Sequence, residues 1–356
     1  MADWGDRPGD AGEGSGADDE AQRAAQVADA RGRFTSLAIR PDHEIDLGEG
    51  ALLNAAEEYP GLDIPAYIGK LDALAQRVRQ RLVALEALPD RPPERVPADT
   101  DEAALAALHV VLFEEEGFTG AEREDYANPR NSFLNEVLDR KRGLPITLSV
   151  VYCEVARRAG LEAVGIGLPG HFIAQFRGQH FSTLIDPYNG GARLQREDCA
   201  GLLRRIFGVP VEVRTEHLLP AAHKAILARM LNNLKGIYVQ RGQLTKALAA
   251  VERILIIQPS VDQVRDRGLL LREMGLLLLR EGRQPGQPAP PDAPSGQGEP
   301  PATVPPRLRE LDLAMQFLSA AWFDLKLYAR EAEGQSDAAA IASRANAVWQ
   351  RAGKQN

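Results

Sequence analysis

Apolar side chains recur every three or four residues over much of this chain, which is the spacing of one face of an α-helix. The pattern runs through residues 31–88 and returns from residue 220 onward. Between these regions, one more helical stretch at 145–160 precedes two short apolar runs of the strand type, at 168–176 and 182–187. The pattern therefore predicts an α+β core with helices on both sides of it.

The stretch at residues 131–191 organises the chain. Pro145 can open its helix, because the N–H that proline lacks would be unpaired in the first turn anyway. Gly160 can close the helix in a left-handed conformation. His171 and Asp186 are polar residues at the edges of the two apolar runs that follow. A hairpin of these two strands would bring them within reach of a hydrogen bond.

Composition divides the chain into four predicted regions. Residues 1–30 are rich in Gly, Ala, Asp and Glu, with little to bury, and predict a disordered acidic tail. Residues 31–98 predict an N-terminal helical region, residues 99–215 the core, and residues 216–356 further helices. Within the last region, the stretch at 284–306 is rich in proline and predicts a flexible insertion.

Small and apolar residues after the core have a spacing that resembles a tetratricopeptide repeat, in which two antiparallel helices touch and a proline ends the unit. They are Leu231, Leu234, Tyr238, Gly242, Ala247, Val251 and Pro259. A second unit begins at about Asp262, and the proline-rich stretch interrupts it. Because so few repeats cannot form a free-standing solenoid, we expect these helices to dock on the core and to offer a surface to a protein or peptide partner.

Length and charge narrow the class of protein. The 356 residues, 44% of them hydrophobic, suffice for more than one soluble domain. A net charge of -8 gives no general attraction to nucleic acid or to an anionic membrane. Two cysteines are too few for a disulfide framework. The N-terminal residues do not combine a basic segment with an apolar run and a cleavage site, so we expect no secretion signal. We expect a cytoplasmic protein that has no membrane segment and does not bind nucleic acid.

Four short motifs lie in or near the central stretch. They are Asn131-Ser132-Phe133-Leu134, Arg142-Gly143-Leu144-Pro145-Ile146, Pro169-Gly170-His171-Phe172 and Ile185-Asp186-Pro187-Tyr188-Asn189-Gly190-Gly191. Together they resemble the transglutaminase-like superfamily, in particular its SirB-like bacterial branch, in which tetratricopeptide repeats follow such a domain. The resemblance covers about residues 101–259. It implies a papain-like core, with a central helix against a small antiparallel sheet.

The resemblance also implies catalytic roles. In active members of the superfamily, a cysteine at the start of the helix is the nucleophile, a histidine on a later strand is its base, and an aspartate on the next strand orients the histidine. His171 and Asp186 match the last two roles. The nucleophile position falls at Pro145, whereas Cys153 lies about 12 Å further along the helix axis.

The place of Cys153 favours a packing role. A catalytic thiol takes its low pKa from a helix N-terminus or a nearby cation, and the helix-end effect fades within the first turn. Cys153 lies two turns into the helix, on an apolar stripe with Val150. A triad of Cys153, His171 and Asp186 stays the basis of an alternative, an acyl transferase or cysteine protease.

The residues around the helix start can each be structural or functional. His171 either pairs with Asp186 or is a turn histidine that caps a backbone carbonyl. The hydroxyl of Thr147 could reach His171, but no special turn forces it outward. The basic residues near Arg142 form a solvated face or a carboxylate site beside a helix N-terminus. The predicted binding residues of this cleft are Asn131, Arg142, Pro145, Thr147 and Asn189.

The missing nucleophile favours a non-catalytic function. The sequence predicts a binding or regulatory module with a degenerate active-site cleft and a repeat-like region for protein interaction. A third possibility is a module that only assembles other proteins through its helices. No cofactor is expected, and no metal site, because His180 and Cys199 have no companions at ligand spacing.

Overall fold

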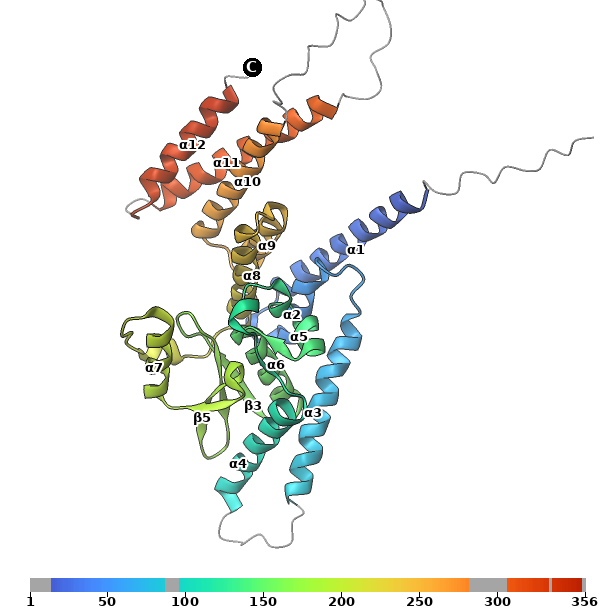
Figure 1. Ribbon diagram of the computed structural model, residues 1–356, viewed down its shortest axis with the longest axis vertical. Coiled ribbons are helices and arrows are strands. Elements are labelled where there is room, and N and C mark those ends of the chain that lie inside the picture. The colour runs from blue at the N-terminus through green and yellow to red at the C-terminus, as the bar shows by residue number, and fades with distance from the viewer. Residues whose placement is uncertain (1–13, 87–95, 282–305, 333–334, 354–356) are drawn as a thin grey trace, which may run out of the picture. The chain divides into compact units, whose positions relative to one another are not determined.

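A computed structural model describes residues 14–86, 96–281, 306–332 and 335–353 (Figure 1). The chain divides into two compact units, Met1–Met230 and Leu231–Asn356. The predicted proline-rich insertion lies outside the described residues except for Pro306, and so do the first thirteen residues of the predicted tail. The predicted boundaries at residues 98 and 215 stay predictions.

The first helix corrects the prediction of a tail that is disordered as far as residue 30. Helix α1 spans Gly14–Ala38, so residues 14–30 are helical. Its Ala, Gln, Glu and Arg residues are strong helix formers, and its C-terminal half packs on α2, Leu47–Ala56, where Phe34 and Leu37 are buried. Arg31 also pairs with Glu57 through two hydrogen bonds of 3.0 and 3.1 Å. Packing at one end thus extends a helix into a segment that has no apolar stripe of its own.

A central helix and a four-stranded sheet form the core of the first unit (Figure 1). Helix α6, Pro145–Arg158, begins at the predicted proline, and Gly160 after it has a left-handed φ of 83°. The strands pair antiparallel in chain order and are β3 (Glu162–Ile166), β4 (Ile173–Arg177), β5 (Ser182–Asp186) and β6 (Ala192–Leu194). Helix α6 packs on β3 and β4. The predicted α+β class is confirmed.

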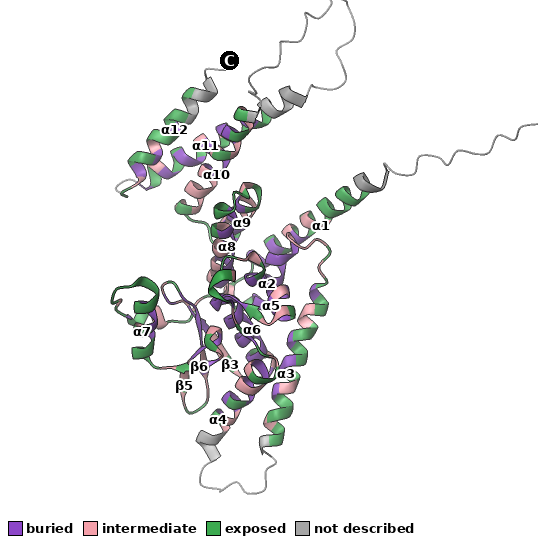
Figure 2. Cartoon of the chain, in the orientation of Figure 1, coloured by how far each residue is buried: buried purple, intermediate pink, exposed green. Residues whose placement is uncertain are grey.

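Other helices of the first unit also pack on α6. Its residues from Pro145 to Ala156 are all buried, as Figure 2 shows by their colour. Besides α1, α2 and α6, this unit contains the helices α3 (Ile64–Glu86), α4 (Val96–His109), the π-helix η3 (Val110–Glu115), α5 (Leu134–Arg140) and α7 (Arg196–Phe207). Short 3-10 turns are η1 (Asp42–Glu44), η4 (Arg123–Asp125), η5 (Pro129–Asn131), η6 (Pro187–Asn189) and η7 (Thr215–Leu218). A parallel pair, β1 (Thr119–Gly120) and β2 (Arg142–Gly143), leads directly into α6.

The second unit is helical throughout its described residues. Helix α8, His223–Gln240, crosses the division between the units. It is followed by α9 (Leu244–Ile257), α10 (Val261–Glu281), α11 (Pro306–Glu331) and α12 (Ala338–Gly353). Gly268 and Gly275 let α11 approach α10 closely, because an added Cβ would lie within 3.0 Å of α11 atoms. The tetratricopeptide assignment and the docking of these helices stay predictions.

Candidate functional site

The structure brings His171 and Asp186 together. Strands β4 and β5 pair with Ala174 opposite Ile185, so the chain just before β4 and the end of β5 meet at one edge of the sheet. Nε2 of His171 lies 3.1 Å from both carboxylate oxygens of Asp186. Their side chains are only 6% and 1% exposed. The imidazole therefore bonds a carboxylate, and the interpretation of His171 as a carbonyl cap does not hold.

The turn after β5 holds the carboxylate of Asp186. The backbone N–H groups of Tyr188 and Asn189 donate to it at 3.1 and 3.4 Å, and Nδ2 of Asn189 donates at 2.6 Å. Burial tends to raise the pKa of Asp186, but the hydrogen bonds from His171 and Asn189 and the electrostatic interaction with His171 outweigh it, so the pKa lies below its usual value. An ionised carboxylate can only accept hydrogen bonds. Nε2 of His171 therefore carries the hydrogen that it donates to Asp186.

Tyr188 ties this turn to the strand pair that precedes α6. Its ring stands edge-on to His171, with centroids 5.9 Å apart, and its hydroxyl donates to the carbonyl of Ala121 at 2.6 Å. Gly120 makes room, since a Cβ there would lie 2.6 Å from the ring. Tyr126 contacts Tyr188 edge-on at 6.3 Å and is 43% exposed. The His–Asp pair is therefore held beside the pair β1–β2, and Tyr126 faces solvent near it.

Arg229 of α8 is a supporting residue that the sequence did not reveal. Its Nη2 donates to the carbonyls of Leu168 at 2.9 Å and His171 at 2.6 Å, and its guanidinium lies 5.3 Å from the Phe172 ring. Burial lowers its pKa. Among the described residues, no carboxylate forms an ion pair with it. Arg229 thus fixes the loop that carries His171. In the sequence, Arg229 stands out only as a cation between the apolar residues Ala228 and Met230.

No nucleophile stands at the start of α6. The helix begins with Leu144 as its N-cap and Pro145 as its first residue, both buried. Thr147 is also buried, and its hydroxyl has no hydrogen-bond partner in the part of the chain that the structure describes. The hydroxyl of Ser149 donates to the carbonyl of Phe172 at 3.4 Å. Neither hydroxyl bonds His171 among the described residues, so the predicted contact of Thr147 with that ring is absent there.

Cys153 is a buried residue of α6, eight positions after the first residue of that helix. It is 7% exposed, and burial, with Glu154 adding to the effect, raises the pKa of its thiol far above the usual value. It lines a cavity with Ala163 and Ile226. Within the described part of the chain, no hydrogen bond joins it to His171. A thiol in this setting stays protonated and is a poor nucleophile.

The remaining predicted binding residues have partners within the protein. Asn131 is buried, where its Nδ2 donates to the carbonyl of Asp125 at 2.6 Å and its Oδ1 accepts from Arg140 at 3.1 Å. Arg142 pairs with Glu122. The other cations of the basic cluster pair as Arg130 with Glu136, Arg140 with Asp125 and Lys141 with Glu116. These acids neutralise the cluster, which argues against an anion site there.

The described residues offer neither a metal site nor a membrane-spanning helix. No group of three or more His, Cys, Asp or Glu side chains there could hold a metal ion. None of the helices in the described ranges combines the length and apolar character that a membrane crossing needs. The predicted cytoplasmic location stays a prediction.

Comparisons with known proteins agree with the fold. The family model described as "Transglutaminase-like superfamily" matches residues 65–232. The chain is 33% identical to a UPF0162 protein of Xylella fastidiosa, over 68% of this chain and 83% of that protein. It is 31% identical to a UPF0162 protein of Pseudomonas aeruginosa, over 69% and 92% of the two chains. F-box only protein 21 of Homo sapiens is 30% identical over 39% of this chain and 22% of its own length. No solved structure matches the chain.

Proposed function

The chain belongs to the UPF0162 family of bacterial proteins with a transglutaminase-like domain, and we propose that it uses this domain for binding or regulation and not for catalysis. One observation carries the proposal. Where the resemblance places a nucleophile, at the start of α6, the chain has Pro145 between Leu144 and Ile146, and none of the three can attack a carbonyl group. Membership of the SirB-like branch stays part of this proposal.

The retained pair has a structural task in this account. His171 and Asp186 join the loop before β4 to the end of β5, and the turn at Asn189 and the guanidinium of Arg229 complete the connection. A buried imidazole needs a partner, because an unpaired polar group away from water costs about 1–3 kcal/mol. The pair can therefore persist in a protein that has lost the nucleophile.

The surface beside the pair suits a peptide. Ile206 and Phe207 at the end of α7 are 42% and 48% exposed. They lie against Gly170, where an added Cβ would be 3.1 Å from atoms of both side chains. Tyr126 is also partly exposed near His171. Exposed aromatic and apolar side chains in one region are typical of surfaces that bind proteins or peptides.

The helices of the second unit would add a surface for a protein partner. Their spacing resembles a tetratricopeptide repeat, a class of repeat that offers extended binding surfaces. The partial likeness to F-box only protein 21 also favours a role in protein interaction.

The rival function is a Cys-His-Asp acyl transferase or protease that uses Cys153, His171 and Asp186. The intact hydrogen bond between His171 and Asp186 is the observation that favours it. It also needs a thiolate next to His171. The burial of Cys153 and the raised pKa of its thiol argue against that step.

Copurification of partners with the full-length chain tests the proposal. The double variant Tyr126→Ala/Phe207→Ala should lose bound partners, whereas Cys153→Ser should keep them. Ile39→Ala, a change at an exposed apolar residue in the turn that follows α1, is the matched control. An acyl adduct on Cys153, or partners lost from Cys153→Ser alone while that variant stays folded, would overturn the proposal.

A further inference from the structure

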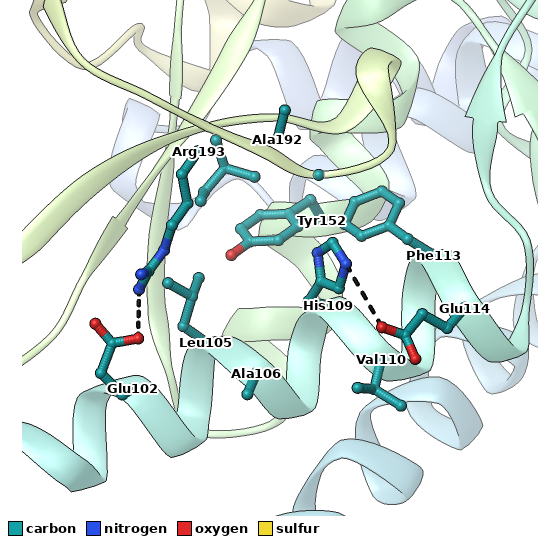
Figure 3. Close-up of a pocket in the computed structure, with 12 residues that line it drawn as sticks. Glu102, Leu105, Ala106, His109, Val110, Phe113, Glu114, Tyr152, Ala192 and Arg193 are labelled. Atoms are coloured by element: carbon teal, nitrogen blue, oxygen red, sulfur yellow. Dashed lines mark hydrogen bonds and ion pairs between the residues drawn. The ribbon is translucent and has the colours of Figure 1, made fainter.

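A cavity of about 440 Å³ lies between α4, η3, α6 and the strands β5 and β6 (Figure 3). Ile185 lines it, whereas the next residue, Asp186, bonds His171. Successive side chains of a strand point to opposite faces of the sheet. The cavity is therefore a separate site on the other face of β5 from the His–Asp pair.

Three rings form one wall of the cavity. His109 and Phe113 have centroids 5.4 Å apart, and Phe113 stacks on Tyr152 with centroids at 6.4 Å and planes 18° apart. Gly191, with a φ of 74°, permits this arrangement. A Cβ at Gly191 would lie 2.3 Å from the Phe113 ring and 3.0 Å from Nδ1 of His109. The opposite lining is aliphatic and includes Leu105 and Ile185.

The hydroxyl of Tyr152 is a further indication of a ligand site. Tyr152 is 1% exposed, and its hydroxyl has no hydrogen-bond partner within the described ranges of the chain. In Figure 3 this oxygen points toward the side of the cavity where Leu105 and Arg193 lie. A buried hydroxyl normally finds a partner. A ligand in the cavity with one hydrogen-bonding group could supply it.

The backbone of the cavity wall is also unusual. Val110–Glu115 is a π-helix that continues α4, and the N–H of Glu116 donates to the carbonyl of Val111, five residues earlier. Such segments are rare and frequently lie at functional sites. Three cavity-lining residues, Val110, Phe113 and Glu114, belong to it.

The charges at the rim indicate a ligand without net charge. Arg193 pairs with Glu102 at 2.6 Å, and His109 lies 3.8 Å from Glu114. The arginine of the lining therefore already has an acidic neighbour, and the carboxylate of Glu114 lies near an imidazole. We propose that this cavity binds a small, uncharged, planar aromatic molecule, which stacks on the ring wall and forms a hydrogen bond with the hydroxyl of Tyr152.

Ligand-observed fluorine NMR with two probes tests this proposal. 4-Fluorophenol has a ring and a hydroxyl, and fluorobenzene has the ring alone. The full-length protein should broaden both signals and bind 4-fluorophenol at least about threefold more tightly. In Tyr152→Phe that preference should disappear, while the affinity for fluorobenzene stays the same.

Filling the cavity is the second arm of the test. Ala106→Trp should weaken both probes at least about tenfold, and Ala24→Trp, on the exposed face of α1, should weaken neither. If Ala106→Trp does not fold, Ala192→Leu on β6 serves the same purpose. No broadening by the wild type, equal binding to a folded cavity-filled variant, or an unchanged preference in Tyr152→Phe would each overturn the proposal.

Discussion

Nη2 of Arg229 donates a hydrogen bond of 2.6 Å to the backbone carbonyl of His171. A residue of α8 thereby fixes the loop that places the imidazole against Asp186. The same nitrogen also donates to the backbone carbonyl of Leu168, so it holds this loop at two points. The geometry of the His–Asp pair therefore depends on a helix that follows the whole core in the sequence.

Removal of the Arg229 guanidinium should weaken the fold. Arg229→Met keeps much of the aliphatic stem but loses two charge-assisted hydrogen bonds, and we expect a loss of about 2 kcal/mol in the free energy of unfolding. Urea denaturation followed by circular dichroism measures it. Arg204→Met, at an exposed arginine on α7, is the control that should change little. Equal stabilities of the two variants would contradict a supporting role for Arg229.

The His171–Asp186 pair should contribute to stability as a coupled unit. Either single alanine variant leaves a buried polar partner behind, so each should lose about 3 kcal/mol. The double variant should lose less than the sum of the two, with a coupling energy of about 1–2 kcal/mol in the double-mutant cycle. Additive losses would show that the two side chains do not stabilise each other. Any folded variant should also keep its bound partners if the pair is structural.

Acid should remove part of this stability. The pKa of Asp186 is lower in the folded protein than its usual value of about 4. A carboxyl whose folded-state pKa is lowered stabilises the fold above its unfolded pKa, and this contribution is lost as the pH falls through the folded pKa. The stability difference between wild type and Asp186→Asn should therefore shrink as the pH falls from about 5 toward 2. A difference that stays constant over this range would contradict the assignment.

Local sequence signals predicted much of the core. Proline at the start of α6 and Gly160 after its end act within one helical turn, so the bounds of that helix could be read from the chain. The two apolar runs that became β4 and β5 carry His171 and Asp186 at one edge. The pattern does not predict strand β3, because the segment Glu162–Ile166 contains Gly165 and has little alternation of polar and apolar residues.

Long-range contacts account for what the sequence could not reveal. Arg229 lies 58 residues from His171, and no local pattern predicts that they meet. The hydrogen bond between Asn131 and Arg140 is likewise set by the fold. The sequence alone therefore could not distinguish a buried structural role of the Asn131 amide from a role in binding. The ring wall of the cavity also joins residues from two distant helices, at Phe113 and Tyr152.

The reactivity of Cys153 separates the two functions most directly. Iodoacetamide treatment of the native full-length protein at neutral pH, followed by peptide mass spectrometry, measures it, and the same treatment in urea is the control for access. Because the thiol is buried and its pKa is raised, we predict that Cys153 stays unmodified in the native protein and is fully modified in urea. Rapid native modification of Cys153 that His171→Ala abolishes would contradict the non-catalytic account.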